Sequence, residues 1–168
     1  MQKQMSSPVK TSSMSRARES ESVDDYVKTI YMLSGDRLRQ VGNTEIADQL
    51  HIAPASATNM LQRLAAAATP LIRYERHRGV TLTDQGRHRA LEIVRHHRLI
   101  ETFLFEILHY PIEELHDEAE RLEHFISEKF EERIAALLGD PQTDPHGHCI
   151  PSLSGIMPES HRVTCACP

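Results

Sequence analysis

The chain has 168 residues, a length that suits one ordinary domain or two small domains sharing a core. Hydrophobic residues make up 39% of it, aromatic residues only 5%, and tryptophan is absent, so we expect a mainly α-helical protein packed with Leu, Ile and Ala. No apolar run is long enough to cross a membrane and no signal-type hydrophobic region opens the chain, which excludes the membrane-spanning class and predicts a cytoplasmic protein.

Charge is distributed unevenly along the sequence. Residues 1–100 contain 15 Lys and Arg against 10 Asp and Glu, whereas residues 101–168 contain 4 against 14. A basic front half suits a polyanion such as nucleic acid, and an acidic back half suits a cation or a partner protein. The asymmetry alone also fits two differently solvated faces, so the motifs have to decide between these interpretations.

The front of the chain is predicted to be helical after an N-terminal arm. Residues 1–20 are rich in Ser, Lys, Arg and Met, which predicts a disordered arm. From Val23 onward apolar side chains recur at spacings of three and four, as on one face of an amphipathic helix. A second helix begins near Asn43 or Thr44, either of which suits a cap. After a short break, Pro54 suits the first turn of a third helix, where its missing N–H is not needed.

The period of the pattern changes after the third helix. Residues 71–83 contain two short β-prone runs around Arg78-Gly79, which predict a hairpin. A long helix is expected from about Arg87 to His109, and residues 113–138 are expected to form one or two further helices. We therefore divide the chain into the arm at 1–20, a DNA-binding domain at 21–88, a helical domain at 89–139 and an irregular tail at 140–168.

Three short helices followed by a hairpin are the element order of a winged helix-turn-helix. The tight break before the third helix orients its exposed side toward the major groove of DNA. The candidate DNA-contacting residues on this helix and on the hairpin tip are Pro54, Ser56, Thr58, Asn59, Gln62, Arg63, Arg76 and Arg78. No acidic residue occurs between Leu50 and Tyr74, which favours DNA binding over an ordinary solvated helix, although winged helices also bind proteins.

The back half places candidate metal ligands at helical spacing on two consecutive helices. The candidates are His97 and Glu101 on the first helix, and His116, Glu120, Glu123 and His124 on the second. Spacings of three and four put such side chains on one helix face. Imidazole with several carboxylates suits Mn²⁺ or Fe²⁺ better than a thiolate-rich set, although Zn²⁺ or Co²⁺ can bind equally tightly. Each group alone also fits a solvated face, and the coincidence of two groups favours a metal site.

Five stretches of the chain resemble the diphtheria-toxin-repressor family, and specifically its manganese-transport-regulator branch. They are VDDYVKTIYML (23–33), NTEIADQLHIAPASATNMLQRL (43–64), RHRGVTLTDQG (76–86), RHHRLIETFLFEIL (95–108) and HDEAERLEHFISEKFEERI (116–134). Together they span roughly residues 22–138. The helix-turn-helix is shared by many regulators, whereas the combination of DDY, RGV-LT-G, H-x3-E and HDEA-x3-EH is far more specific.

The resemblance implies a homodimeric transcriptional repressor that controls metal-ion homeostasis by binding a palindromic operator when a divalent metal is bound. The primary metal site of the family falls on Asp25 in the first helix and on Glu120, Glu123 and His124, so the ion would join the two domains. Hard oxygen donors at Asp25 and Glu120 favour Mn²⁺, with Fe²⁺ as the alternative. The ancillary site of the family falls on His97, Glu101 and His116.

Two features depart from the family pattern. Lys28 stands where the manganese branch often has Glu, and a protonated amine cannot bind a cation, which argues against the close two-metal arrangement of that branch. Residues 144–152 resemble the linker before an SH3-like third domain, and the chain ends sixteen residues later, so we expect no such domain and a weaker ancillary site. The tail residues His146, His148, His161, Cys165 and Cys167 are interpreted as having no function.

Two other functions are alternatives to the metal-activated repressor. A winged-helix regulator without a metal switch would use the acidic helix only for dimer contacts. A di-metal carboxylate enzyme on a helical bundle needs Glu-x-x-His on two helices, and residues 113–116 supply only one such motif. With no Gly-rich phosphate loop and no nucleophile triad in the sequence, we expect no enzymatic activity.

Overall fold

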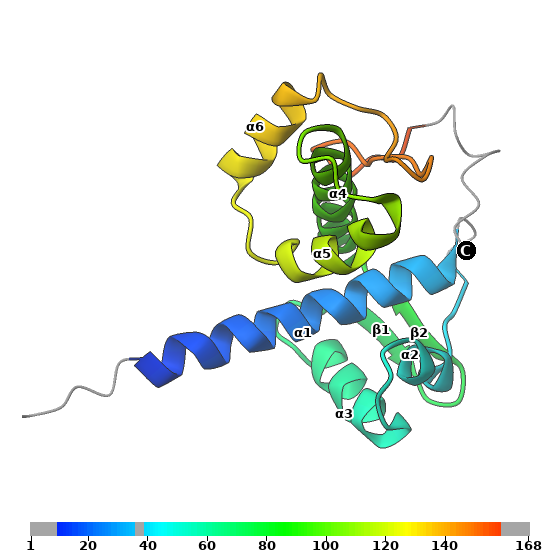
Figure 1. Ribbon diagram of the computed structural model, residues 1–168. Helices are drawn as coiled ribbons and strands as arrows, with labels where there is room; N and C mark the ends of the chain where they lie inside the picture. Colours follow the sequence, from blue (N-terminus) through cyan, green and yellow to red (C-terminus); the bar gives the residue numbers. More distant parts are fainter. Residues whose placement is uncertain (1–9, 36–38, 159–168) are drawn as a thin grey trace, which may run out of the picture.

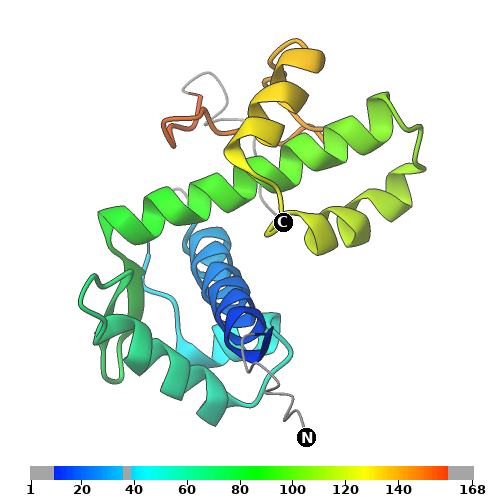
Figure 2. The ribbon, with the colours of Figure 1, turned by 90° about the vertical axis from the view of Figure 1, so that its left-hand side faces the viewer.

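The computed structural model describes residues 10–35 and 39–158. In this part of the chain the long helix α1 (Lys10–Ser34) lies between two groups of elements (Figure 1). On one side are α2 (Asn43–Gln49), α3 (Pro54–Ala65) and the hairpin of β1 (Ile72–Glu75) and β2 (Gly79–Leu82). On the other are α4 (Asp84–Glu106), the 3-10 helix η1 (Ile112–Glu114), α5 (Leu115–Leu122) and α6 (Glu128–Leu137). Figure 2 shows α4 running across α1.

The first group of elements is a winged helix-turn-helix. The inner faces of α1, α2, α3 and the hairpin, with the segment before α2, bury one mostly aliphatic core, made of Tyr26, Ile30, Val41, Ile46, Leu61, Leu64, Ile72 and Val80. Local sequence explains the helix starts. Pro54 occupies the first turn of α3, and the Glu45 carboxylate accepts a hydrogen bond from the Gly42 N–H (2.8 Å) at the start of α2. β1 and β2 pair antiparallel, with Ile72 opposite Leu82.

A glycine allows the segment before α2 to pack against the wing. Gly79 has φ +112°, and a Cβ atom there would lie 2.3 Å from the Val41 carbonyl oxygen. Because that space is free, Val41 and Val80 exchange backbone hydrogen bonds of 2.9 Å in both directions. The wing is thereby fixed to the connection between α1 and α2.

The second group of elements packs around α4. Leu99 contacts Ile134 and Ala135 of α6 and Ile150 of the C-terminal segment on one face. A separate core made of Ile100, Leu104, Leu115 and Ala119 joins α4 to α5. The segment after α6 is irregular, and it is held by Arg98, whose guanidinium donates to the Cys149 carbonyl oxygen. Cys149 itself is disulfide-bonded.

The mainly helical fold with a winged helix-turn-helix agrees with the sequence prediction. Three predicted boundaries differ from the structure. Residues 10–20 belong to α1, so the predicted disordered arm is helical there, while residues 1–9 lie outside the described part. α4 begins at Asp84 instead of Arg87, because Thr83 Oγ1 caps it by accepting from the Gly86 N–H (3.1 Å). It ends at Glu106 instead of His109, which has φ +57°. None of the helices among the described residues is long and apolar enough to span a membrane.

Candidate metal centre and DNA-binding surface

Three groups of potential metal ligands meet where α1, α4 and α5 come together. Within each group, one ligand atom per residue lies within 4.8 Å of the others. We name them the bridging cluster (Asp25, Glu123 and His124), the central cluster (His97, Glu120 and Glu123) and the outer cluster (His97, Glu101 and His116). All seven predicted ligands belong to these clusters, although Glu120 groups with His97 instead of with Asp25. Shared residues make the three clusters one continuous set of donors.

The bridging cluster combines ligands from both groups of elements. His124 Nε2 lies 3.0 Å from Asp25 Oδ1 and 3.3 Å from Glu123 Oε1. Asp25 is on α1, whereas Glu123 and His124 directly follow the last residue of α5. Glu123 retains helical dihedrals (φ −57°, ψ −29°), so the predicted helical spacing continues past the helix end. An ion held here would join α1 to α5.

Carboxylates hold His124 as a cation while no ion is bound. Burial lowers the pKa of His124, but Asp24, Asp25 and Glu123 together outweigh it and raise the pKa to about 10. The imidazole is therefore protonated at neutral pH. Because a metal binds the neutral imidazole, binding at this cluster must displace a proton.

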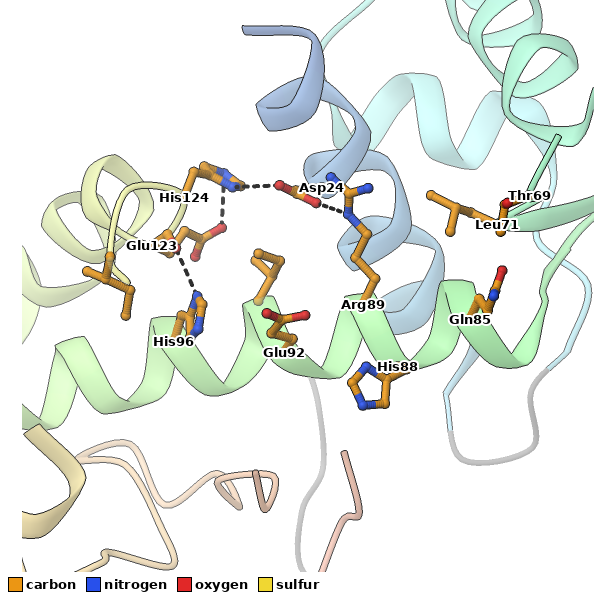
Figure 3. A pocket seen from close by; sticks show the side chains of 12 residues that line it. Asp24, Thr69, Leu71, Gln85, His88, Arg89, Glu92, His96, Glu123 and His124 are labelled. Atoms are coloured by element: carbon orange, nitrogen blue, oxygen red, sulfur yellow. Dashed lines mark hydrogen bonds and ion pairs between the residues drawn. The ribbon is translucent and has the colours of Figure 1, made fainter. Parts of the chain in front are cut away.

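The ion pair of Asp24 and Arg89, which no sequence motif indicated, lies behind His124 (Figure 3). Asp24 on α1 pairs with Arg89 on α4, and Asp24 Oδ2 lies 3.7 Å from His124 Nδ1. That nitrogen is buried and has no hydrogen-bond partner within 20–35 and 39–158. Burial raises the pKa of Asp24, but His124 and Arg89 lower it by a larger amount. The pKa is therefore lowered overall, and Asp24 remains a carboxylate. A carboxylate behind a ligating histidine sets its tautomer and orientation, and Asp24 is positioned to direct His124 Nε2 toward Asp25.

A lysine of the protein already contacts the central cluster. Lys28, one turn after Asp25 on α1, donates from Nζ to Glu120 Oε1 and to both Glu123 oxygens, at 2.9 and 2.8 Å. Its Nζ lies 3.5 Å from His97 Nδ1, and that nitrogen lies 2.6 Å from Glu123 Oε2. Burial raises the pKa of Glu120, but the ammonium outweighs it, so the pKa is lowered. Lys28, the residue that departs from the family pattern, is therefore an ion-pair partner of the predicted ligands Glu120 and Glu123.

The outer cluster lies entirely on the helical side of the molecule. His97 Nε2 is 3.2 Å from Glu101 Oε1 and 3.3 Å from His116 Nδ1. Burial lowers the pKa of His97 and Lys28 opposes protonation as well, yet hydrogen bonds to Glu101 and Glu123 raise the pKa overall. These ligands come from α4 and α5, so an ion here would take no ligand from α1, although Lys28 and Met32 of α1 line the same cavity.

The C-terminal segment adds a residue beside the outer cluster. His146 Nε2 lies 3.6 Å from Glu101 Oε1. The segment is shaped by Asp144, whose Oδ1 accepts from the N–H groups of His146 (2.9 Å) and His148 (2.8 Å). From the sequence, His146 was interpreted as part of a tail without function. Its signal was the DPHGH turn motif, in which a buried Asp fixes the following histidines.

The donor chemistry of the bridging cluster fits a divalent cation. Asp25 and Glu123 supply carboxylate oxygens and His124 supplies one imidazole nitrogen, with Glu120 on the same helix face. Carboxylates with one or two imidazoles suit Mn²⁺ and Fe²⁺. Glu123 is fully buried and pairs with Lys28, and the carboxylates of Asp25, Glu120 and Glu123 together still exceed the single charge of Lys28 by two. The residues present therefore match such an ion in both donor type and charge.

The predicted DNA-contacting residues of α3 share one exposed side of the helix. Pro54, Ser56, Asn59, Gln62 and Arg63 are exposed, whereas Ala57, Leu61 and Leu64 face the core. Thr58 differs, because its hydroxyl donates to the Pro54 carbonyl oxygen (3.0 Å) and accepts from Asn43 Nδ2 (3.1 Å). Thr58 thus stabilises the packing of α2 against α3.

The tip of the hairpin presents the predicted basic residues to solvent. Arg76 and Arg78 are exposed on either side of His77, which has φ +66°. Arg78 Nη1 lies 3.2 Å from Glu75 Oε2, with 75% of the arginine side chain exposed. A pair this exposed is weak, so a phosphate can replace Glu75 as the partner of Arg78.

Comparison with known proteins matches both halves of the chain. The model of the iron dependent repressor N-terminal DNA binding domain matches residues 19–80, and that of the iron dependent repressor metal binding and dimerisation domain matches residues 83–152. The iron-dependent repressor IdeR of Mycobacterium tuberculosis is 33% identical over 141 residues, which cover 83% of this chain and 60% of that protein. An uncharacterized HTH-type transcriptional regulator of Methanocaldococcus jannaschii is 35% identical over 115 residues, which cover 68% of this chain and 90% of that protein.

A similar solved structure is a manganese-dependent transcriptional repressor in complex with manganese. It matches with a TM-score of 0.73 and 41% identity, over 81% of this chain and 61% of that chain. The present chain thus spans about three fifths of the length of the mycobacterial repressor and of this structure.

Proposed function

We propose that this chain, which belongs to the iron-dependent repressor family and to its manganese-dependent branch, is a transcriptional repressor that binds a palindromic operator as a homodimer when loaded with Mn²⁺. Fe²⁺ is the alternative ion. The family consists of transcriptional repressors and not of enzymes. Control of metal-ion homeostasis is the role proposed for the repressor.

The bridging cluster is the observation that carries this proposal. Asp25 belongs to α1, which packs against α2 and the wing, whereas Glu123 and His124 belong to the helical half. Glu120 is the fourth proposed ligand, one turn before Glu123 and His124. The ion would supply a double positive charge that four ligands from two halves share. It would thereby favour one arrangement of α1 relative to α5, which is how a ligand couples to a distant site.

The proposed DNA contacts follow from the exposed residues of α3 and the wing. Ser56, Asn59, Gln62 and Arg63 have side chains that hydrogen-bond to base edges or phosphates. Arg76 and Arg78 on the wing would contact the phosphate backbone or the minor groove. In a symmetric dimer, two such helices enter successive major grooves one helical turn apart, about 34 Å, which explains a palindromic operator.

An apolar groove supports the proposed dimer. It lies between α4, α5 and α6, and is lined by Phe103, Leu108, Leu122, Phe125, Phe130 and Ile134. Phe125 is 66% exposed and Phe130 is 47% exposed. Exposed aromatic patches of this kind mark protein interfaces, and the family model for these residues describes a dimerisation domain.

A DNA-binding measurement tests the proposal. Duplexes selected from a random library in the presence of Mn²⁺ should bind the protein tightly with Mn²⁺ and weakly with EDTA. Arg78→Ala should weaken binding to all duplexes and reduce the salt slope by about one. Equal affinity in Mn²⁺ and EDTA would contradict the metal switch and favour the winged-helix regulator without one.

A further inference from the structure

The central cluster has the composition of a cation site, and it already contains a cation. Its three donors, from His97, Glu120 and Glu123, lie within 4.8 Å of one another. The Lys28 ammonium donates to Glu120 and to both oxygens of Glu123, and lies 3.5 Å from His97 Nδ1. One group therefore contacts every member of the cluster.

Carboxylate oxygens surround the Lys28 ammonium as they would surround a bound metal ion. The Lys28 side chain is 14% exposed and that of Glu123 is fully buried, so neither charge is compensated by water. An ammonium has three N–H donors and no acceptor, and Lys28 directs them at carboxylate oxygens. Breaking such a buried pair is strongly unfavourable because the remaining charge loses its partner.

We propose that Lys28 is a built-in second cation, which occupies the central cluster in place of a metal ion and limits the protein to a single ion on the Glu120–Glu123 carboxylates. The inference rests on the proposed function, because it assumes that the bridging cluster binds an ion. A carboxylate-bridged pair of ions, which needs sites about 3.5–4 Å apart, is then excluded. Lys28 thereby determines the stoichiometry of the switch.

The charges of the site support this assignment. Asp25, Glu120 and Glu123 carry three negative charges, and Lys28 reduces them to two, which one divalent ion neutralises. With Glu at position 28, four carboxylates would need two divalent ions. Because these carboxylates surround the fully buried Glu123, excess negative charge is unfavourable there, and the residue at position 28 selects between one ion and two.

Lys28 also affects the metal-free protein. It is on α1 and its partners are on and after α5, so it joins the two halves of the molecule before any ion binds. Asp25, three residues earlier on the same helix, already contacts His124 at 3.0 Å, and a metal ion would replace the proton between these two ligands and add Glu123 to the connection. The ion therefore completes an existing contact instead of creating the whole interface.

Electron paramagnetic resonance of the Mn²⁺-loaded protein, with native mass spectrometry to count ions, tests the proposal. The natural chain should give only isolated Mn²⁺ signals at saturation, whereas Lys28→Glu should give the exchange-coupled signal of a bridged pair. Lys129→Glu, which makes the same charge change at an exposed position of α6, should behave like the natural chain. An ion at the outer cluster shares no carboxylate with the bridging cluster, so it raises the count without producing a coupled pair.

A second variant keeps the test informative if Lys28→Glu does not fold. Lys28→Met removes the competing charge without adding a ligand, and should bind the first Mn²⁺ at least about tenfold more tightly. A coupled pair in the natural chain, isolated ions alone in folded Lys28→Glu, or unchanged affinity in Lys28→Met would each overturn the proposal while leaving the repressor function intact. A natural chain that binds no Mn²⁺ would overturn both.

Discussion

The bridging and outer clusters contain the same kinds of donor, yet they connect different parts of the molecule. Asp25 brings α1 into the bridging cluster, whereas the outer cluster takes its ligands from α4 and α5, with His146 of the C-terminal segment beside it. Only the first arrangement lets an ion change how the DNA-binding half sits on the helical half. Ligand chemistry thus identifies a metal site, whereas the elements that supply the ligands determine whether the site can act as a switch.

The largest difference between the clusters should come from Glu123→Gln. Glu123 contacts His124, Lys28 and His97, so its loss removes a ligand and also the negative charge that faces Lys28 and His124. Mn²⁺ affinity should fall by more than about 100-fold, beyond the 10- to 100-fold typical of changes behind a ligand. Calorimetric titration checks the affinity, and Glu132→Gln on exposed α6 is the control. An unchanged affinity would remove Glu123 from the site.

A smaller effect on the same cluster should follow from Asp24→Asn, which removes the carboxylate behind His124. Mn²⁺ affinity should fall by about 10- to 100-fold, since residues that orient a ligating histidine have effects of this size. The number of protons released per ion should fall as well, because Asp24 helps to raise the pKa of His124. Asp24→Glu should recover part of both quantities, and a loss of affinity with normal proton release would indicate a purely structural role.

The bridging cluster should also respond to pH. The pKa of His124 is raised from 6.5 to about 10, so its protonation stabilises the metal-free fold fully below pH 6.5, and this contribution is lost as the pH rises through about 10. Between these values Mn²⁺ must displace the proton, and its affinity should increase by about tenfold per pH unit. Titrations in buffers of different ionisation enthalpy measure the released proton. An affinity that does not depend on pH would contradict the protonated state of His124.

The smallest effect on DNA binding should come from the outer cluster. Glu101→Gln removes a ligand from a cluster that contains no α1 residue, so affinity for a selected duplex at saturating Mn²⁺ should stay within about threefold of the natural value. The Mn²⁺-dependent rise in Tm should decrease, because an ion that binds the folded state stabilises it. If Glu101→Gln abolished Mn²⁺-dependent DNA binding, the separation between the two clusters would be wrong.

Much of the candidate site was predictable because helical spacing places side chains on common faces. The i, i+3, i+4 spacing of Glu120, Glu123 and His124 predicts that their side chains lie close together, and it requires no knowledge of the tertiary structure. The assignment of Asp25 needed the family resemblance, because its distance to α5 depends on how two helices pack. The contacts of Lys28 with Glu120 and Glu123 were equally inaccessible, since the sequence indicated only that an amine replaces a ligand.

The fold shows the same division between local and long-range information. Caps and turns such as Pro54 and Arg78-Gly79 are local signals, and they predicted the order of helices and hairpin. The helical start at Lys10 was missed because polar composition resembles that of a disordered arm. The position of His146 beside Glu101 was not predicted, because Arg98 holds the turn at Asp144 against α4 through a contact between segments far apart in sequence.

The central claim is that one ion joins α1 to the end of α5. Anomalous scattering from crystals of the full chain grown with Mn²⁺ and a selected duplex tests it most directly. The account predicts an anomalous peak coordinated by Asp25, Glu120, Glu123 and His124, with the Lys28 ammonium still in contact with the carboxylates of Glu120 and Glu123. A peak confined to His97, Glu101 and His116, with none beside Asp25, would contradict it.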